Sequence, residues 1–302
     1  MDDDDDETEE ETKKDLRNRV FFNLYTKNNP GNPQLLYIGK AAVLKESDFD
    51  PQKETIIITH GWIHSGNSES CTLIRDAFIE HGDYNVIVVD WNKISLRPYL
   101  WVTKRVPMIS EFVATMINFL EEHDMDLSKT TMIGHSLGAH IVGIAGRNAK
   151  SCNVLHLLPS GLDPALPAFI TAGPGSRIAT GDASTVEIMH TNAGLLGYSS
   201  AIGDIDFYPN GGSKQPGCIV DVGGACSHAR AYHFYAESIN TKLGFHAQKC
   251  DSYRDFRKGR CQSDVTALMG GYKDAIAEWG KFFLYTRSKS PYALGPVCEL
   301  CI

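Results

Sequence analysis

The sequence predicts an α/β fold with a mostly parallel central sheet flanked by helices. The middle of the chain alternates short β-branched apolar runs with amphipathic segments of helical length, as in parallel strands joined by crossover helices. One strand-to-helix junction carries the pentapeptide GHSLG at 134–138, which is typical of a sharp turn that presents a serine at the edge of the sheet. No Pro-, Gly- or Ser-rich linker divides the chain, so we expect one domain over residues 16–302.

Five short apolar runs are expected to form buried strands, because they are rich in Val, Ile, Leu or Met. They occupy residues 55–59, 85–91, 130–134, 154–158 and 186–190. Segments of helical length lie between them, at about 68–81, 104–122 and 137–149. In the last of these, Leu137, Ile141 and Ile144 share one face at helical spacing.

The net charge of −8 is concentrated at the N-terminus. Nine acidic residues and no basic residue lie within positions 2–11, and without those nine charges the rest of the chain carries +1. We therefore expect residues 1–15 to form an acidic, disordered tail, to which the sequence assigns no function. The near-neutral remainder gives no electrostatic basis for binding nucleic acid.

The cysteines favour a secreted protein with disulfide bonds. Eight are present, an even number concentrated towards the C-terminus: Cys71, Cys152, Cys218, Cys226, Cys250, Cys261, Cys298 and Cys301. No second Cys or His pair at ligand spacing accompanies the CxxC at 298–301, so we expect neither a metal nor another cofactor.

No apolar stretch is long enough to predict a transmembrane span. The first residues do not resemble a signal peptide, so a secreted form would have lost its signal already.

Ser136, at the centre of GHSLG, is the candidate nucleophile. The flanking strand and helix are the structural context in which this motif indicates an esterase, and the N-terminal end of the helix would stabilise an oxyanion. The hydroxyl needs a base and the base needs an acid, which follow in the order Ser, Asp or Glu, His. Asp163 is the best-placed acid and His228 the best-placed base. The acids Asp182, Asp204, Asp206 and Asp221 and the bases His156, His190, His233 and His246 remain alternatives.

Seven blocks of sequence, in order, resemble the pancreatic lipase family. They are HGW at 60–62, VDW at 89–91, GHSLGAH at 134–140, GLDPA at 161–165, DFYPNGG at 206–212, QPGC at 215–218 and CSHxR at 226–230. A weaker block, SPYA, follows at 290–293, so that the resemblance runs from about residue 18 to about residue 296.

The resemblance implies the α/β-hydrolase fold and a role for each matched residue. It implies a triad of Ser136, Asp163 and His228, with an oxyanion hole formed by the backbone N–H groups of Trp62 and Leu137. His60 is interpreted as structural. The spacing of Cys250 and Cys261 matches a disulfide of the family. The pairing of Cys71, Cys152, Cys298 and Cys301 remains open, and Cys71 with Cys152 and Cys298 with Cys301 is one of three possibilities.

Two expected loops are short for a digestive lipase. Cys218 and Cys226 enclose only seven residues, too few for a two-helix lid, and the segment between His190 and Asp206 is also short. Short versions of both are the pattern of phospholipase A1 members of the family, including insect enzymes. The resemblance therefore favours a secreted phospholipase A1 that cleaves the sn-1 ester. The alternatives are a triacylglycerol lipase or general carboxylesterase, and a non-catalytic lipid-binding or yolk-type protein.

Three absences complete the expectation. The chain ends soon after the SPYA block, so we expect no C-terminal β-sandwich domain and no colipase partner. Some relatives bind calcium in the loop after the triad acid, but residues 173–179 contain no carboxylate, so we expect no calcium site here. The expected ligand is a phospholipid or neutral lipid at a lipid–water interface.

Overall fold

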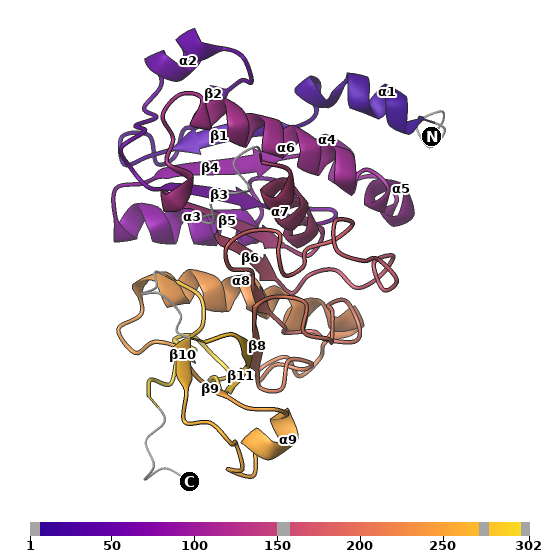
Figure 1. The fold of residues 1–302 in the computed structure, drawn as a ribbon, viewed down its shortest axis with the longest axis vertical. Coiled ribbons are helices and arrows are strands. Elements are labelled where there is room, and N and C mark those ends of the chain that lie inside the picture. The colour runs from indigo at the N-terminus through magenta and orange to yellow at the C-terminus, as the bar shows by residue number, and fades with distance from the viewer. Residues whose placement is uncertain (1–6, 150–157, 272–277, 297–302) are drawn as a thin grey trace.

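The computed structural model describes residues 7–149, 158–271 and 278–296, and eleven strands within them form one sheet. The strand order is β10-β9-β11-β8-β7-β6-β5-β3-β4-β1-β2 (Figure 1). Seven neighbouring strands, from β11 to β4, run parallel, while β1, β2, β9 and β10 are antiparallel additions at the two edges. The predicted α/β class with a mostly parallel sheet is confirmed.

The chain crosses the sheet broadly from the edge at β1 and β2 to the edge at β9 and β10, but β4 lies between β1 and β3, and β11 lies between β8 and β9. The strands are β1 Phe21–Tyr25, β2 Gln34–Leu36, β3 Thr55–Thr59, β4 Asn85–Asp90, β5 Thr130–His135, β6 Leu158–Leu162, β7 Glu187–Met189, β8 Ile205–Pro209, β9 His246–Lys249, β10 Thr266–Leu268 and β11 Gly280–Leu284. The helices are α1 Glu9–Lys14, α2 Ala41–Glu46, α3 Glu69–His81, α4 Asn92–Ser95, α5 Tyr99–Thr103, α6 Val106–Glu121, α7 Leu137–Asn148, α8 Ala225–Asn240 and α9 Tyr253–Phe256. Short 3₁₀ turns lie at Leu16–Asn18, Leu127–Lys129 and Val222–Gly224.

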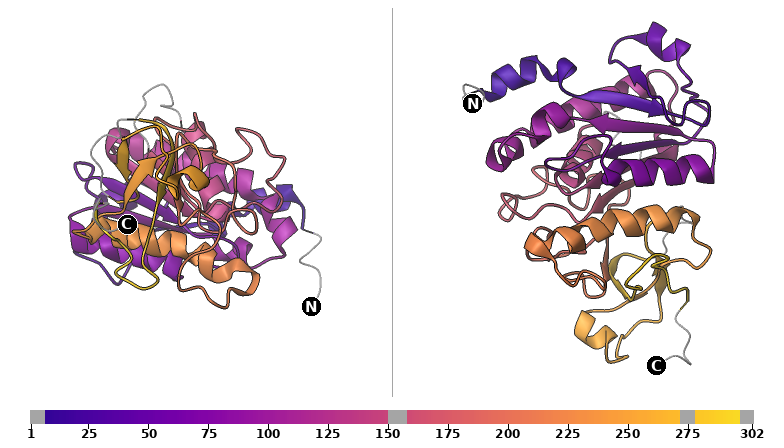
Figure 2. Two further views of the ribbon diagram at one scale, coloured as in Figure 1. Left: turned by 90° about the horizontal axis from the view of Figure 1, so that it is seen from below. Right: turned by 180° about the vertical axis from the view of Figure 1, so that it is seen from behind.

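Helices cover both faces of the sheet, and the alternation of strand residues explains why. Ile56 and Ile58 pack into the cluster that includes α3 and α8, whereas Ile57 packs into the cluster that includes α6 and α7. Every side chain of β3 is buried, which accounts for its continuous apolar sequence. The α6–α7 pair lies on one side and the α3–α8 pair on the other (Figures 1 and 2).

The expected helices at 68–81, 104–122 and 137–149 all form, with ends within two residues of prediction. The strand expected at 154–158 differs. Residues 154–157 lie outside the described residues, and β6 is Leu158–Leu162, where a connection was expected. Its backbone pairs with β5 from Thr131 to His135, and β7 pairs on its other side. Pairing on both sides therefore outweighs the low strand propensity of Pro159 and Gly161.

The expectation of a disordered tail over residues 1–15 is wrong for its second half. Helix α1 begins with a capping box, in which Thr8 and Glu11 exchange side-chain-to-backbone hydrogen bonds. Arg105 is only 3% exposed and holds this segment through the backbone carbonyl of Glu7 and the hydroxyl of Thr12. The acidic composition predicted a solvated segment. That prediction failed because composition does not reveal Arg105, a buried arginine that binds Thr12 from 93 residues further along the chain.

We predict that Arg105→Met destabilises the fold. The substitution leaves the acceptors on Glu7 and Thr12 without their donor and removes the guanidinium from the face of the Trp101 ring, 3.5 Å from its centroid. The expected loss is about 2 kcal/mol in urea unfolding. Lys13→Ala is the control, because the ion pair of Lys13 with Glu111 is exposed and such pairs contribute about 0–1 kcal/mol. Equal losses in the two variants would contradict a role for Arg105 as the anchor.

Candidate active site

Ser136 occupies a strained turn between β5 and α7. Its backbone angles, φ 59° and ψ −119°, are sparsely populated for a residue with a side chain. Such strain persists only where the surroundings hold it. Here a Cβ at Gly134 would lie 2.1 Å from the Gly138 carbonyl oxygen, and one at Gly138 would lie 2.5 Å from the His60 oxygen. The two motif glycines therefore permit a close approach of helix and strand that forces Ser136 outward.

The side chains of Asp163 and His228 are in direct contact. His228 Nδ1 lies 2.6 Å from Asp163 Oδ2, so the ring donates its Nδ1 hydrogen to a fully buried carboxylate. The other carboxylate oxygen accepts from the backbone N–H groups of Thr191 at 2.7 Å and Asn192 at 3.0 Å. Three donors to one buried carboxylate fix both its position and the tautomer of the imidazole.

His228 lies in the first turn of α8, directly after the loop between Cys218 and Cys226. These two cysteines form a disulfide, with Cα atoms 5.7 Å apart. Asp221, inside the loop, accepts hydrogen bonds from the N–H groups of Cys226 at 2.8 Å and Ser227 at 3.2 Å. The start of the helix that carries His228 is therefore held by a side-chain cap and a covalent bond.

Ser136 is linked to this pair through neighbouring residues. The Ser136 N–H donates to the carbonyl of Leu162, the residue before Asp163, at 3.0 Å. The ring of His135, the residue before Ser136, lies 4.4 Å from the ring of His228. Among the described residues, no hydrogen bond joins the Ser136 hydroxyl to His228. Catalytic hydrogen bonds are often long or absent without substrate, so the lack of one here does not exclude Ser136 and His228 as partners.

The competing acids all have structural partners. Asp182 binds Arg147 and the Ala179 N–H, while Asp206 binds His190 and two backbone N–H groups. Asp204 accepts from the Val186 N–H at 2.8 Å, and Asp221 caps α8.

The competing histidines have other surroundings. His190 is fully buried and lies between the Tyr198 carbonyl and Asp206. His233 lies 3.8 Å from Glu69, and His246 begins β9. His156 lies outside the described residues.

The loop after β3 passes directly alongside Ser136. A Cβ at Gly61 would lie 2.8 Å from Ser136 Cβ, so the backbone between Gly61 and Trp62 borders the serine. The Trp62 indole donates to the Arg97 carbonyl at 2.8 Å, and its ring packs edge-on against Tyr99. Leu137 is the first residue of α7, where a backbone N–H has no acceptor within its own helix.

His60 is fully buried and stacks on Trp91. Its Nδ1 donates to the Gly61 carbonyl at 2.9 Å, and its Nε2 accepts from the Trp91 N–H at 3.1 Å. With both ring nitrogens bonded to backbone, His60 shapes the loop that carries Trp62.

Exposed apolar side chains surround the site on several loops. In the Cys218–Cys226 loop, Ile219 is 94% exposed, and Val220 and Val222 are nearly as open. Leu195, in the loop after β7, lies against Gly224 of the Cys218–Cys226 loop and is itself exposed. Further exposed apolar side chains follow β3, β4 and β6: Ile63, Leu96, Leu100 and Ile170. The carboxyl ends of parallel strands meet at one edge, so these loops share that edge with Ser136.

His140 is a site residue that the sequence analysis did not assign. It is fully buried in α7, where its Nε2 donates to the Ala165 carbonyl at 2.8 Å and its Nδ1 accepts from the Ile178 N–H at 3.3 Å. It also stacks on Phe169, with ring centroids 4.0 Å apart. These contacts hold the segment that follows Asp163. The signal was present in the motif GHSLGAH, but its role depends on contacts that spacing does not reveal.

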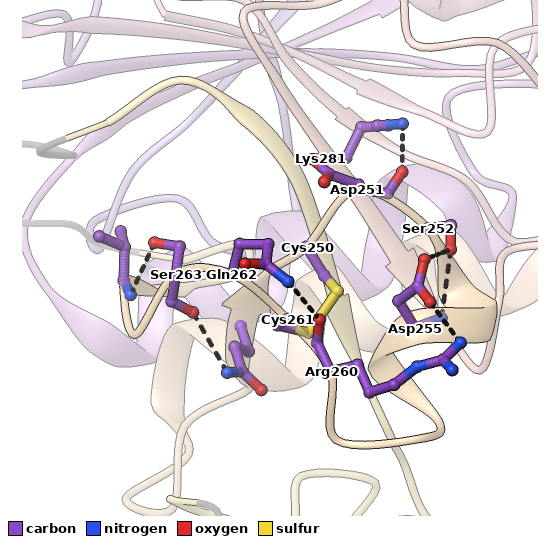
Figure 3. The surroundings of a disulfide bond; sticks show 11 residues. Cys250, Asp251, Ser252, Asp255, Arg260, Cys261, Gln262, Ser263 and Lys281 are labelled. Carbon is purple, nitrogen blue, oxygen red and sulfur yellow. Dashed lines mark hydrogen bonds and ion pairs between the residues drawn. A yellow bond between two sulfur atoms is a disulfide. The ribbon is translucent and has the colours of Figure 1, made fainter.

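A cavity of about 640 Å³ lies away from these residues, beside the second disulfide, Cys250–Cys261 (Figure 3). Its lining includes Lys249, Lys281 and Gln262, and none of Ser136, Asp163 or His228. Around the disulfide, Ser252 and Asp255 form a helix cap, Arg260 binds Asp255, and Lys281 donates to the Asp251 carbonyl. This cavity has no contact with the candidate active site.

Three further findings concern the described residues alone. Cys71 is buried and forms no disulfide with another described cysteine, while its possible partner Cys152, together with Cys298 and Cys301, lies outside the described residues. Within residues 7–149, 158–271 and 278–296, no group of three or more His, Cys, Asp or Glu side chains is arranged to hold a metal. None of the helices in these ranges is both long and apolar enough to cross a lipid bilayer.

The fold and the strand–Ser–helix turn define an α/β-hydrolase. Comparison with known families specifies it further, since the family described as Lipase matches residues 3–292. The chain belongs to this family, as the resemblance to pancreatic lipases predicted. It is 34% identical over 303 residues to the human "Inactive pancreatic lipase-related protein 1" and 33% identical over 305 residues to the "Pancreatic triacylglycerol lipase" of Cavia porcellus.

These matches cover 90% and 91% of this chain but 64% and 65% of the two relatives, so the chain spans just under two thirds of their length. Among solved structures, a phospholipase/carboxylesterase from Dyadobacter fermentans overlaps with 51% of this chain and 74% of its own, at 13% identity and a TM-score of 0.36.

We predict that His140 makes the fold sensitive to acid. Burial lowers the pKa of His140 from 6.5 to about 4, so the unfolded chain takes up a proton first as the pH falls. Stability is therefore lost between pH 6.5 and 4, by up to about 3 kcal/mol from this residue. His140→Gln retains a donor for Ala165 but does not titrate, so urea unfolding at pH 7 and 4.5 should show a smaller difference for the variant. An unchanged difference would assign the acid sensitivity to other groups.

Proposed function

We propose that this protein is a secreted serine ester hydrolase of lipids, with Ser136 as nucleophile, His228 as base and Asp163 as the acid that orients it. The observation that carries the proposal is the 2.6 Å contact between His228 and the buried Asp163, beside the strained turn at Ser136. A buried carboxylate that fixes a partly exposed imidazole next to a serine is the arrangement that acyl transfer requires. The two disulfides seen among the described residues support an extracellular location.

In the proposed reaction, His228 Nε2 takes the Ser136 proton as the serine oxygen bonds to the ester carbonyl carbon. The Trp62 and Leu137 N–H groups stabilise the negative oxygen of the tetrahedral intermediate, an effect of about 10²–10³ in turnover for each donor. The C–O bond to the leaving alcohol then breaks, and His228 protonates that alcohol. Water, losing a proton to His228, attacks the acyl carbon; the C–O bond to Ser136 then breaks, the fatty acid leaves, and His228 returns the proton to the serine oxygen. Asp163 stabilises the positive imidazole in each step.

For the substrate, we propose phospholipids cleaved at the sn-1 ester. The seven residues closed by the Cys218–Cys226 bond form only a 3₁₀ turn, which is too short to be a helical lid that would exclude a polar head group. The exposed apolar side chains of this loop and its neighbours favour contact with a lipid surface, because each is unfavourably hydrated when free. No resident cofactor is needed for this chemistry.

The named relatives include both a triacylglycerol lipase and a protein called inactive, so membership of the family leaves activity to be measured on this chain. A triacylglycerol lipase or carboxylesterase would use the same residues on a different ester. A non-catalytic lipid carrier would retain the apolar surface without turnover.

We predict that Ser136→Ala and His228→Gln each abolish ester hydrolysis, lowering kcat about 10⁴–10⁶-fold. Both variants remove an atom that takes part in each step, while the fold around them is retained. The assay is fatty-acid release from phosphatidylcholine, with circular dichroism to verify folding. His233→Gln is the matched control, since His233 is on the same helix and pairs only distantly with Glu69. Substantial activity in Ser136→Ala would disprove the mechanism.

We predict further that phosphatidylcholine is cleaved faster than triolein. With different acyl chains at the two glycerol positions, mass spectrometry should find the sn-1 fatty acid and a 2-acyl lysophospholipid as the first products. Cleavage of triolein alone would establish a triacylglycerol lipase. Lipid binding without release of fatty acid from any ester would establish a carrier.

A further inference from the structure

His135, the residue before the proposed nucleophile, contacts the residue proposed as base. It is 3% exposed, and its Nε2 lies 3.1 Å from the backbone carbonyl oxygen of His228. The two imidazole centroids are 4.4 Å apart, and Tyr232, one turn further along α8, meets the His135 ring edge-on at 5.0 Å. The end of β5 and the first turns of α8, 93 residues apart in sequence, are therefore joined at the base itself.

The chemistry of this contact fixes the protonation of His135. A carbonyl oxygen only accepts, so Nε2 carries a hydrogen and donates it. Burial, followed by the neighbouring His228 and His64, lowers the pKa of His135 well below its usual value, so the ring stays neutral. A neutral ring puts no positive charge beside His228, which must itself become positive during acyl transfer.

Packing alone does not account for a histidine at this position. Nδ1 of His135 is buried and finds no hydrogen-bond partner among the described residues. A buried polar atom without a partner is unfavourable, and an apolar ring would fill the same volume without that cost. What histidine provides and an apolar ring does not is the Nε2 hydrogen, which is directed at the His228 carbonyl.

We propose that His135 is a positioning residue that locks the His228 base in register with the Ser136 turn. Asp163 holds the imidazole of His228 at Nδ1 only, and a ring held at one atom can pivot about that point. The hydrogen bond from His135 holds the backbone of the same residue, and the contact between the two rings restricts the swing of the imidazole. Two anchors on one residue determine where Nε2 of His228 points. This inference rests on the proposed triad and adds the residue that aligns it.

The test compares His135→Gln with His135→Phe. Gln places an N–H donor near the position of Nε2, whereas Phe keeps the ring and its contact with Tyr232 but donates nothing. On p-nitrophenyl butyrate we expect His135→Phe to lower kcat about 10–100-fold, with KM changed less than twofold, because a displacement of about 1 Å costs that much turnover. His135→Gln should retain kcat within about fivefold. Unfolding midpoints measured in parallel separate a loss of alignment from a loss of stability.

A second measurement does not depend on turnover. The Nδ1 proton of a histidine that donates to a buried carboxylate gives a far-downfield proton NMR signal, which His228→Gln should remove. We expect this signal to persist in the wild type and in His135→Gln, and to broaden or disappear in His135→Phe. His135→Met, which also lacks a donor, takes the place of the Phe variant if that variant does not fold.

The outcomes are distinct. Unchanged kcat and an unchanged signal in the variant without a donor would overturn the proposal, as would equal losses in the Gln and Phe variants. A wild type that neither hydrolyses esters nor reacts with an organophosphate at Ser136 would overturn the proposed function instead. In that event the NMR comparison still decides whether His135 aligns His228.

Discussion

The close approach of α7 to the sheet at Gly134 and Gly138 is the constraint from which the rest of the candidate site follows. At that distance a side chain on either glycine would collide with backbone, and Ser136 between them is forced to a positive φ. The strained turn fixes the serine relative to the ends of β3 and β6 rather than within one flexible loop. Asp163 directly follows β6 and Trp62 lies three residues after the end of β3, so both lie at the same edge of the sheet as Ser136. His228 alone does not follow a strand of the parallel sheet, because it lies in α8. Its position therefore depends on further contacts, which are the disulfide and the Asp221 hydrogen bonds at the start of that helix.

The residues of the candidate site differ in how far the sequence could predict them. Ser136 and its flanking strand and helix were predictable because the signal is local: a β-branched run, a GxSxG turn and an amphipathic segment are contiguous. Asp163 and His228 were not separable from their competitors by spacing alone. The difference lies in the partners of each carboxylate. Asp182 and Asp204 bind groups 35 and 18 residues away, while Asp206 and Asp221 accept from backbone N–H groups three to six residues away. No sequence pattern reveals either kind of contact. The family motifs supplied that choice.

The strands that were missed differ from those found in a physical way. The strand β3, predicted to the residue, is apolar throughout and buried on both faces. β8 contains Asp206 and Pro209, and β6 contains Pro159 and Gly161, so neither has the pattern of a strand. Both form because neighbouring strands pair with them on each side. The sequence analysis assigned no role to His135 or His140 for a similar reason. Each donates a hydrogen bond to a backbone carbonyl far away in the sequence, which no local pattern reveals.

The covalently closed loop before α8 has a consequence for conformational entropy. A long flexible cover over an active site must become ordered when it meets a lipid surface, at a cost of about 1–2 kcal/mol for each residue fixed. The segment between Cys218 and Cys226 is already restricted by its disulfide and by the hydrogen bonds of Asp221, in water as at an interface. Most of the conformational entropy of this loop is therefore already lost when the protein folds, before any contact with an interface. At the lipid surface proposed as the site of action, the free energy gained when Ile219 and Val220 leave water would contribute almost entirely to binding.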